Sequence, residues 1–235
     1  MALRPWSPIP ITPEDDPLIP LPRELLRLEP HPYASLGAPY GKDACPFRLR
    51  ARVVQRLLKA QLLLQQKESG WRLAIFDAWR PVAVQRFMVA HATAEACRER
   101  GLDPNGSGPA WERVRDEVGM FWAPPSEDPA TPPPHSTGAA VDLTLASLLG
   151  APLEMGGSID AIGPISHPDH FAAAAASAPD GEAACWHQRR RLLAEVMAGA
   201  GFAQHPQEWW HYSHGDQLWA WRTGQPLAFY GRVGD

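Results

Sequence analysis

The segment from His135 to Asp142 carries two side chains that could hold a metal ion. A histidine on a loop is followed by Gly138, which permits a sharp turn, and then by a β-prone run in which Asp142 lies between apolar residues. An unpaired carboxylate is costly to bury in such a run, and a metal or another cation would remove that cost. The alternative interpretation is a turn histidine followed by an aspartate that caps a loop.

The second candidate cluster is Glu208-Trp209-Trp210-His211. Two tryptophans form a water-poor wall, and burial raises the pKa of a neighbouring carboxylate towards neutrality, as a general base requires. Residues i and i+3 of an ideal strand face opposite sides of the sheet. Glu208 therefore shares a site with His211 only if it lies in a turn or bulge before the strand. The alternative interpretation is a rim carboxylate beside a core histidine.

Together the two clusters supply three metal ligands, His135, Asp142 and His211. Catalytic zinc takes three protein ligands and leaves the fourth position for water, whose pKa it lowers to about 7. With Glu208 as the general base, the set predicts a hydrolytic reaction. We expect one zinc ion per chain, although another divalent metal could use the same ligands.

A third candidate, Arg80, lies between a predicted buried strand and a predicted helix. It precedes Pro81, which biases it away from the helical conformation at the start of that helix. From there its guanidinium could stabilise an oxyanion through charge-assisted hydrogen bonds. It could equally pair with Asp77 to close the strand–helix turn, and the two roles are compatible.

Apolar periodicity and flanking Gly or Pro residues predict the elements that position these side chains. They are helices over about 46–69, 81–100 and 182–200, and buried strands over 71–77 and 139–145. Two β-prone runs, 208–213 and 217–223, flank the short turn 214–216 and predict a hairpin. Helices interspersed with strands favour an α+β fold with a mostly antiparallel sheet and flanking helices.

Proline, with 26 residues in all, is concentrated near the start of the chain and again in residues 123–134. Because proline lacks an N–H group, neither segment can be a helix or a central strand. We expect residues 1–32 to form an extended arm over the surface, and residues 123–134 to form a stiff loop that leads into His135. No internal repeat or domain boundary is evident, so residues 1–235 are predicted to form one domain.

Composition disfavours several classes of function. The chain has 22 basic and 26 acidic residues in 235, with no Lys/Arg block, so no nucleic-acid partner is expected. Prolines interrupt the start of the chain where a signal peptide needs an apolar run, and no stretch is long and apolar enough to predict a membrane partner. Cys45, Cys97 and Cys185 are odd in number and widely spaced, which indicates reduced thiols in a cytoplasmic protein. The oligomeric state is not predicted.

In this order, the features resemble those of the D-alanyl-D-alanine dipeptidase family, zinc metallopeptidases that include the dipeptidases of vancomycin resistance. The similarity extends from about residue 32 to residue 222, and the two predicted metal-binding motifs are specific as a pair. Further matches are Tyr33-Ala34, Asp77-x-x-Arg80-Pro81, Met155-Gly156-x-x-x-Asp160, Arg190-Arg191-x-Leu193 and Met197-x-x-x-Gly201-Phe202.

The resemblance implies an α+β fold shared with other D-Ala-D-Ala metallopeptidases and with hedgehog-like domains. It implies zinc at the three predicted ligands, Glu208 as the catalytic base, and Arg80 as the residue that stabilises the tetrahedral intermediate. Asp160 and Tyr33 match the family positions that hold the substrate ammonium. The implied reaction is hydrolysis of a small free dipeptide, D-alanyl-D-alanine, to two amino acids.

Two features depart from the family pattern: Gly157-Ser158-Ile159 follows Met155-Gly156 at the rim of the pocket, and position 133 differs. Many members have serine two residues before the first zinc-binding histidine, where this chain has Pro133. Proline offers neither a hydroxyl nor an N–H group, so a substrate contact from this position is limited to its carbonyl. Both departures concern substrate specificity rather than the zinc chemistry.

Two other functions remain open. A D-Ala-D-Ala carboxypeptidase acting on peptidoglycan stem peptides would need an open groove and export, which the Pro-rich walls and the start of the chain disfavour. A hedgehog-like binding module with structural zinc would have no use for Glu208 or Arg80. Among the histidines outside the ligand set, His205 has a sequence reason to lie beside the site, because Glu208 follows three residues later. None of these histidines is predicted to be a ligand.

Overall fold

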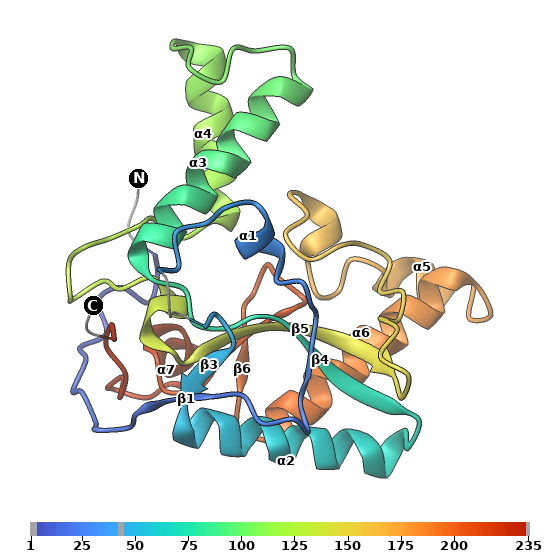
Figure 1. The fold of residues 1–235 in the computed structure, drawn as a ribbon. Helices are drawn as coiled ribbons and strands as arrows, with labels where there is room; N and C mark the ends of the chain where they lie inside the picture. Colours follow the sequence, from blue (N-terminus) through green and yellow to red (C-terminus); the bar gives the residue numbers. More distant parts are fainter. Residues whose placement is uncertain (1–3, 42–44, 234–235) are drawn as a thin grey trace.

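The computed structural model describes residues 4–41 and 45–233, and Figure 1 shows its arrangement. A five-stranded sheet has the order β2-β4-β5-β7-β6, formed by Leu26–Arg27, Trp71–Asp77, Ala140–Ser147, His211–Ser213 and Ala203–Gln204. β2 pairs with β4 in parallel, and the other neighbours are antiparallel. The predicted α+β class with a mostly antiparallel sheet is confirmed, and the strand predicted over 71–77 has those bounds.

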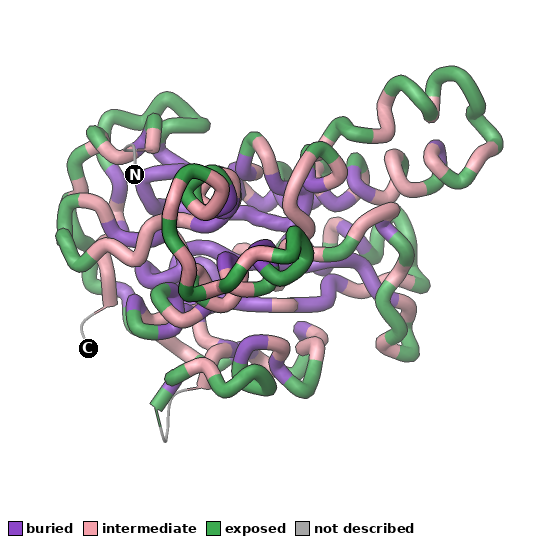
Figure 2. Tube along the Cα trace, turned by 90° about the horizontal axis from the view of Figure 1, so that it is seen from above, coloured by how far each residue is buried: buried purple, intermediate pink, exposed green. Residues whose placement is uncertain are grey.

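Two long helices cover one side of this sheet. α2 (Ala51–Lys67) and α6 (Glu182–Gly199) pack against each other and against the central strands (Figure 1). Their buried faces share a hydrophobic core with β4 and β5, in which Leu57 and Leu193 are fully buried. Figure 2 shows this core as the buried trace through the centre of the molecule. The core fixes the strands that carry the candidate site residues.

A second pair of helices projects from the body. α3 (Val82–Glu99) and α4 (Pro109–Phe121) pack against each other through their own small apolar cluster, which includes Met88 and Val118 (Figure 1). α3 was predicted, whereas α4 was not. Trp111, Val114, Val118 and Phe121 recur at helical spacing in α4 and belong to this cluster, so the apolar periodicity of the helix was an available signal.

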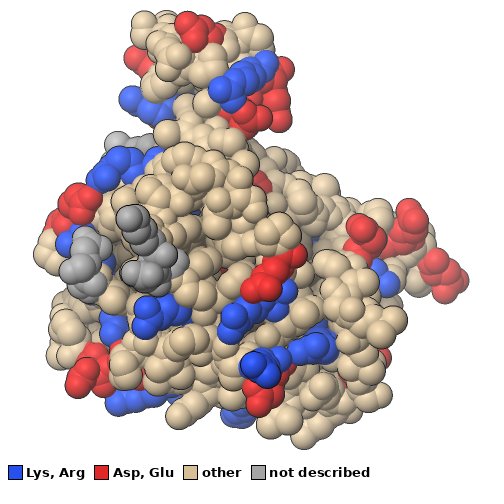
Figure 3. All heavy atoms as spheres, in the orientation of Figure 1, with Lys and Arg blue, Asp and Glu red and all other residues tan. Residues whose placement is uncertain are grey.

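The remaining helices are short. They are α1 (Pro32–Ser35), α5 (Ala172–Ser177), α7 (Gln217–Thr223) and two 3-10 turns, η1 (Pro134–Thr137) and η2 (Pro164–Ser166). None of the helices in the described residues is long and apolar enough to cross a membrane. On the face drawn in Figure 3, basic and acidic side chains are interspersed, without one continuous area of either sign.

The predicted hairpin over 208–223 is wrong in its second half. Residues 217–223 form a helix, α7 (Gln217–Thr223), that follows β7 directly. The side chain of Asp216 caps this helix by accepting a hydrogen bond from the backbone N–H of Trp219, at 2.8 Å. Gly224, with φ of 67°, ends it in the left-handed conformation. These cap signals outweigh the β propensity of the tryptophans.

The described part of the Pro-rich arm combines turns at residues 5–8 and 23–24 with two short strands and is built into the fold. β1 (Leu18–Pro20) pairs with β3 (Arg48–Arg50) in a separate two-stranded sheet, and β2 forms an edge of the main sheet. Ile11 pairs with Ala228 near the other end of the chain. Figure 1 shows the two ends of the chain on the same side of the molecule. The arm thereby reaches the region of the candidate site.

Candidate active site

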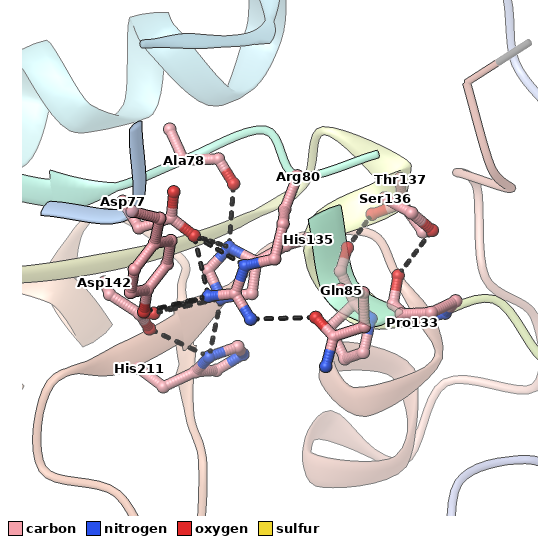
Figure 4. Close-up of polar contacts among 12 residues, drawn as sticks. Asp77, Ala78, Arg80, Gln85, Pro133, His135, Ser136, Thr137, Asp142 and His211 are labelled. Atoms are coloured by element: carbon pink, nitrogen blue, oxygen red, sulfur yellow. Dashed lines mark hydrogen bonds and ion pairs between the residues drawn. The ribbon is translucent and has the colours of Figure 1, made fainter. Parts of the chain in front are cut away.

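The three predicted metal ligands lie together. β5 and β7 place Asp142 directly opposite His211, and η1 brings His135 to the same point (Figure 4). His135 Nε2 lies 3.2 Å from His211 Nδ1 and 3.2 Å from Asp142 Oδ2, while His211 Nδ1 lies 3.0 Å from Asp142 Oδ1. All three side chains are buried. They are the one group of His, Cys, Asp or Glu residues in the described chain that converges as a metal site would.

The hydrogen bonds of the two histidines direct one ring nitrogen of each towards the cluster. His135 Nδ1 lies 2.7 Å from the carbonyl oxygen of Ala78 and must donate its hydrogen there, so the Nε2 lone pair faces the cluster. His211 Nε2 contacts the Ser213 hydroxyl at 3.3 Å, which leaves Nδ1 free to face the cluster as well. Burial alone would raise the pKa of Asp142, but the two histidines hold it well below its ordinary value.

The spacing of the three donor atoms also matches a small metal ion. In a tetrahedral zinc site with ligand distances of about 2.0–2.1 Å, donor atoms lie about 3.3 Å apart. The observed separations of 3.0–3.2 Å are close to that value. Three electron-pair donors at such distances repel one another unless a cation lies between them. The residues present therefore fit a divalent metal.

A tight turn at Gly138 makes this arrangement possible. Gly138 ends η1 with φ of 70°, a left-handed conformation that turns the chain from His135 into β5. A Cβ atom there would lie 2.4 Å from Leu18 Cδ2 of the arm. The glycine is needed for its conformation and for its lack of a side chain.

Glu208 lies in the turn before β7, the position that would let it share a site with His211. Its side chain is buried, with Oε2 at 3.7 Å from His211 Nδ1 and Oε1 at 3.6 Å from His205 Nδ1. Burial raises the pKa of Glu208 well above its usual range, and the carboxylates of Asp142 and Asp160 add to the effect. A carboxyl group held in this state suits proton transfer.

The two neighbouring tryptophans lie in different surroundings. Trp210 lines the same pocket as the three ligands. The ring of Trp209 instead packs under the guanidinium of Arg190, at 5.0 Å, in the core. The water-poor wall expected from both tryptophans is therefore formed by Trp210, while Trp209 anchors the turn from behind.

Arg80 is held in place by several groups. Its Nε and Nη2 donate to Asp77 Oδ2 at 2.9 and 2.7 Å, and its Nη1 donates to Gln85 Oε1 at 2.8 Å (Figure 4). Its Nη2 also lies 3.4 Å from Asp142 Oδ2, beside the metal ligands. The structure thus shows the expected pair with Asp77 and also directs the guanidinium towards the cluster. A β-bulge near Asp77 sets the register that brings it opposite Asp142.

Asp160 and Tyr33 are hydrogen-bonded to each other beside Arg80. The Tyr33 hydroxyl donates to Asp160 Oδ2 at 2.7 Å, and Asp160 lines the pocket that holds the ligands. Burial, with Asp142 nearby, raises the pKa of Asp160 to about 7. Asp160 has φ of 65°, which is strained for a residue other than glycine. Arg190 holds its loop by donating to the carbonyl oxygen of Met155 at 2.8 Å.

Several other residues line the pocket and were not predicted from the sequence. Gln85 and Trp122 come from the helical projection, while Arg4 and Trp6 come from the N-terminal arm. His205 also lines it, and its proximity to Glu208 in sequence was the available signal. The other four residues carry no local motif, because their place depends on contacts between distant segments.

Pro133 lies outside this pocket, whereas Pro134 lines it. The carbonyl oxygen of Pro133 accepts hydrogen bonds from the backbone N–H of Ser136 at 3.0 Å and from its hydroxyl at 2.7 Å. These bonds form the turn that presents His135. The carbonyl is thus engaged within the chain, and the substrate contact considered for it is not supported.

Comparison with known proteins shows one consistent similarity. The family described as D-ala-D-ala dipeptidase matches residues 27–227. A D-alanyl-D-alanine dipeptidase of Synechocystis is 43% identical, over 98% of this chain and 97% of the relative. Another from Enterococcus faecium is 31% identical, over 68% of this chain and 73% of the relative.

One solved structure is also similar at low identity. It is a mutant of the vancomycin resistance D,D-pentapeptidase VanY from a VanB-type cassette, in complex with Zn(II). The two chains share 15% identity with a TM-score of 0.44, over 89% of this chain and 88% of the other.

Proposed function

The chain belongs to the D-ala-D-ala dipeptidase family of peptidases, and from this premise we propose that it hydrolyses free D-alanyl-D-alanine with one zinc ion. The zinc would be held by His135, Asp142 and His211. The observation that carries the proposal is the buried convergence of these three donors with Glu208 in one pocket. The names of the relatives supply the substrate class.

Bound zinc would act as a Lewis acid towards the peptide carbonyl and the attacking water. Glu208 would accept the proton of that water and pass it to the leaving amine. Its carboxylate lies within 3.7 Å of His211 Nδ1, so a water beside the ligands is within its reach. Its buried position favours both steps, because burial raises the pKa of the carboxyl group and so makes the carboxylate a stronger base.

Arg80 would stabilise the oxyanion that develops on the peptide carbonyl. Asp77 and Gln85 hold its guanidinium on two sides, and the rings of Tyr33 and Trp122 lie 4.9 and 5.1 Å from its central carbon. A donor fixed in this way does not need to reorganise during the reaction. We propose Asp77 as the positioning residue for Arg80.

Asp160 and Tyr33 would bind the ammonium group of the dipeptide. An ammonium placed beside the Asp160 carboxylate would compensate its buried charge. The Tyr33 hydroxyl, by donating to Asp160 Oδ2, fixes the direction in which that carboxylate points. Recognition of a free amino terminus would favour dipeptides over N-acylated chains.

Two features support a short substrate over a stem peptide. Arg4 and Trp6 of the arm line the pocket beside the ligands. Gln217 binds the arm to the Pro-rich loop by donating to the carbonyl oxygens of Ser7 and Ala130, at 3.1 and 3.0 Å. The hedgehog-like alternative is disfavoured because buried Glu208 and Arg80 both face the ligand cluster.

We further propose that the protein acts in the cytoplasm. Its three cysteines, Cys45, Cys97 and Cys185, are all free thiols in the structure. Free thiols suit a reducing compartment.

The test is an assay of the zinc-loaded protein with D-Ala-D-Ala, L-Ala-L-Ala and N-acetyl-D-Ala-D-Ala. We expect turnover of the first, and a loss of about 10²–10⁴-fold in kcat for Glu208→Ala. Metal analysis would accompany the assay, with about one zinc retained by Glu208→Ala and lost from His135→Ala. Absence of turnover in the wild type, or full activity in Glu208→Ala, would contradict the proposal. A preference for the acylated substrate would favour the carboxypeptidase.

A further inference from the structure

We propose that Arg4 binds the terminal carboxylate of the dipeptide, so that the N-terminal arm completes the substrate site. The inference rests on the proposed hydrolysis of a free dipeptide. It starts from the position of Arg4, which lines the same pocket as the metal ligands although it lies more than 100 residues away from them in sequence.

The arm is held firmly where it reaches the pocket. Trp6 is 6% exposed, and its ring lies 5.4 Å from that of His205 and 5.6 Å from that of Trp221. Gln217 donates to the carbonyl oxygens of Ser7 and Ile9 and fixes the next residues. Arg4 therefore extends from a segment whose path is set by buried contacts.

The guanidinium of Arg4 is also fixed, by hydrogen bonds to neutral groups rather than by an ion pair. Nη2 donates to the carbonyl oxygens of Gly119 and Trp122 at 2.8 and 3.0 Å, and Nη1 donates to that of Met120 at 3.0 Å. These neutral groups at the end of α4 use three of its five N–H donors. Within the described residues, no carboxylate lies within ion-pair distance of Arg4. A half-buried cation of this kind is a ready partner for an anion.

The pocket holds side chains of both charges beside the ligand cluster. Asp160 accepts a hydrogen bond from the Tyr33 hydroxyl near Arg80. Arg4 lines the same pocket with Glu208 and His205, whose Oε1 and Nδ1 lie 3.6 Å apart. A free dipeptide is a zwitterion, with an ammonium at one end and a carboxylate at the other. Asp160 and Arg4 would complement the two ends, with the peptide bond between them at the metal ligands.

Binding of the substrate carboxylate by Arg4 would also replace a substrate contact that the proline at position 133 cannot make. Pro133 has no hydroxyl, and its carbonyl is engaged by Ser136. The arm instead supplies a cation from a different direction. A substrate extended beyond its second residue would lack a carboxylate at this point and would meet the wall formed by Trp6. Arg4 would thus determine the specificity for dipeptides.

The test compares D-Ala-D-Ala with D-alanyl-D-alaninamide, which lacks the terminal negative charge. The wild type should prefer the free acid in kcat/KM by about 10- to 100-fold, the range expected for a charge-assisted hydrogen bond. Arg4→Gln should reduce that preference to about threefold or less, mainly by raising KM for the free acid. Arg4→Lys should keep much of it. Arg113→Gln, which removes an exposed arginine from α4, is the matched control and should keep the full preference.

A purely structural role for Arg4 at the end of α4 gives a different result. Arg4→Gln would then lower the activity on both substrates by the same factor, and the unchanged preference would overturn the inference. Calorimetric binding of both dipeptides to Glu208→Gln, with and without Arg4→Gln, measures the same preference without turnover. Equal binding of acid and amide by the protein that retains Arg4 would also overturn it. Failure of the proposed reaction is distinguishable, because it would abolish turnover in the wild type.

Discussion

The substitution Asp77→Asn tests how Arg80 is held, and its cost follows from the contacts of this one carboxylate. Asp77 is fully buried, accepts two hydrogen bonds from Arg80, and lies 3.0 Å from His31 Nε2. Asparagine preserves the shape but removes the charge opposite a buried guanidinium. Breaking a buried ion pair in this way costs about 3–5 kcal/mol. Because Asp142 remains 3.4 Å from Arg80, we expect the lower end, about 3 kcal/mol.

The measurement is thermal and denaturant unfolding of the zinc-free protein, so that loss of metal does not contribute. A cost of about 3 kcal/mol corresponds to a fall in Tm of about 6–12 °C for a chain of this size. The loaded enzyme should lose about 10²–10³-fold in kcat if Arg80 leaves the oxyanion position. Asp16→Asn is the matched control, since Asp16 is buried but accepts from the Tyr230 hydroxyl and the Arg52 backbone. It should keep its activity.

A double-mutant cycle with Arg80→Met separates pairing from packing. If Asp77 and Arg80 stabilise the fold as a pair, the double variant should be less destabilised than the sum of the two single variants, by about 1–3 kcal/mol. An Asp77→Asn protein that unfolds within about 1 kcal/mol of the wild type and retains kcat would refute the reasoning. It would mean that Gln85 and the aromatic rings hold Arg80 without the carboxylate.

Three further predictions follow from single residues. Asp160→Asn should raise KM for D-Ala-D-Ala by about tenfold or more with a smaller change in kcat, and an unchanged KM would exclude Asp160 from ammonium binding. Gly138→Ala should destabilise the protein by at least about 1–2 kcal/mol in urea unfolding, because of the left-handed φ and the contact with Leu18, whereas equal stability would contradict both causes. Burial lowers the pKa of His214 to about 4, below the value of about 6.5 in an unfolded chain. The unfolded state then binds the proton more readily, so stability should fall by up to about 3 kcal/mol as the pH falls from 6.5 to 4, and His214→Gln should remove this part of the pH dependence.

The sequence predicted those parts of the site that are set by local spacing. His135, Gly138 and Asp142 belong to one turn and one strand, so their relative positions follow from the backbone. The requirement that Glu208 lie in a turn before β7 came from strand geometry alone. Residues brought in from distant segments could not be predicted in this way. Arg4 contacts carbonyl groups more than 110 residues away, and no local pattern encodes that contact.

The error at α7 has a different cause. Residues 217–223 contain two tryptophans and a leucine, which suit a strand as well as a buried helix. The helix is favoured over the strand by Asp216, whose side chain caps it, and by Gly224, which ends it. Capping residues carry about 1 kcal/mol each, and in a short segment this outweighs weak propensities. The same helix presents Gln217, which ties the arm to the Pro-rich loop.

The charges in the pocket explain why the proposed metal and substrate belong to the same site. Arg80 pairs with Asp77 and lies 3.4 Å from Asp142, whereas Asp160 and Glu208 are buried and form no ion pair with an arginine or lysine of the described residues. The raised pKa values of Asp160 and Glu208 share two causes, burial and the negative charge of Asp142. A divalent cation at Asp142 would therefore lower both values together. Asp160 would then be ionised and could bind an ammonium group, and Glu208 would be ionised and could accept a proton. Binding of the metal would thus favour both substrate binding and proton transfer.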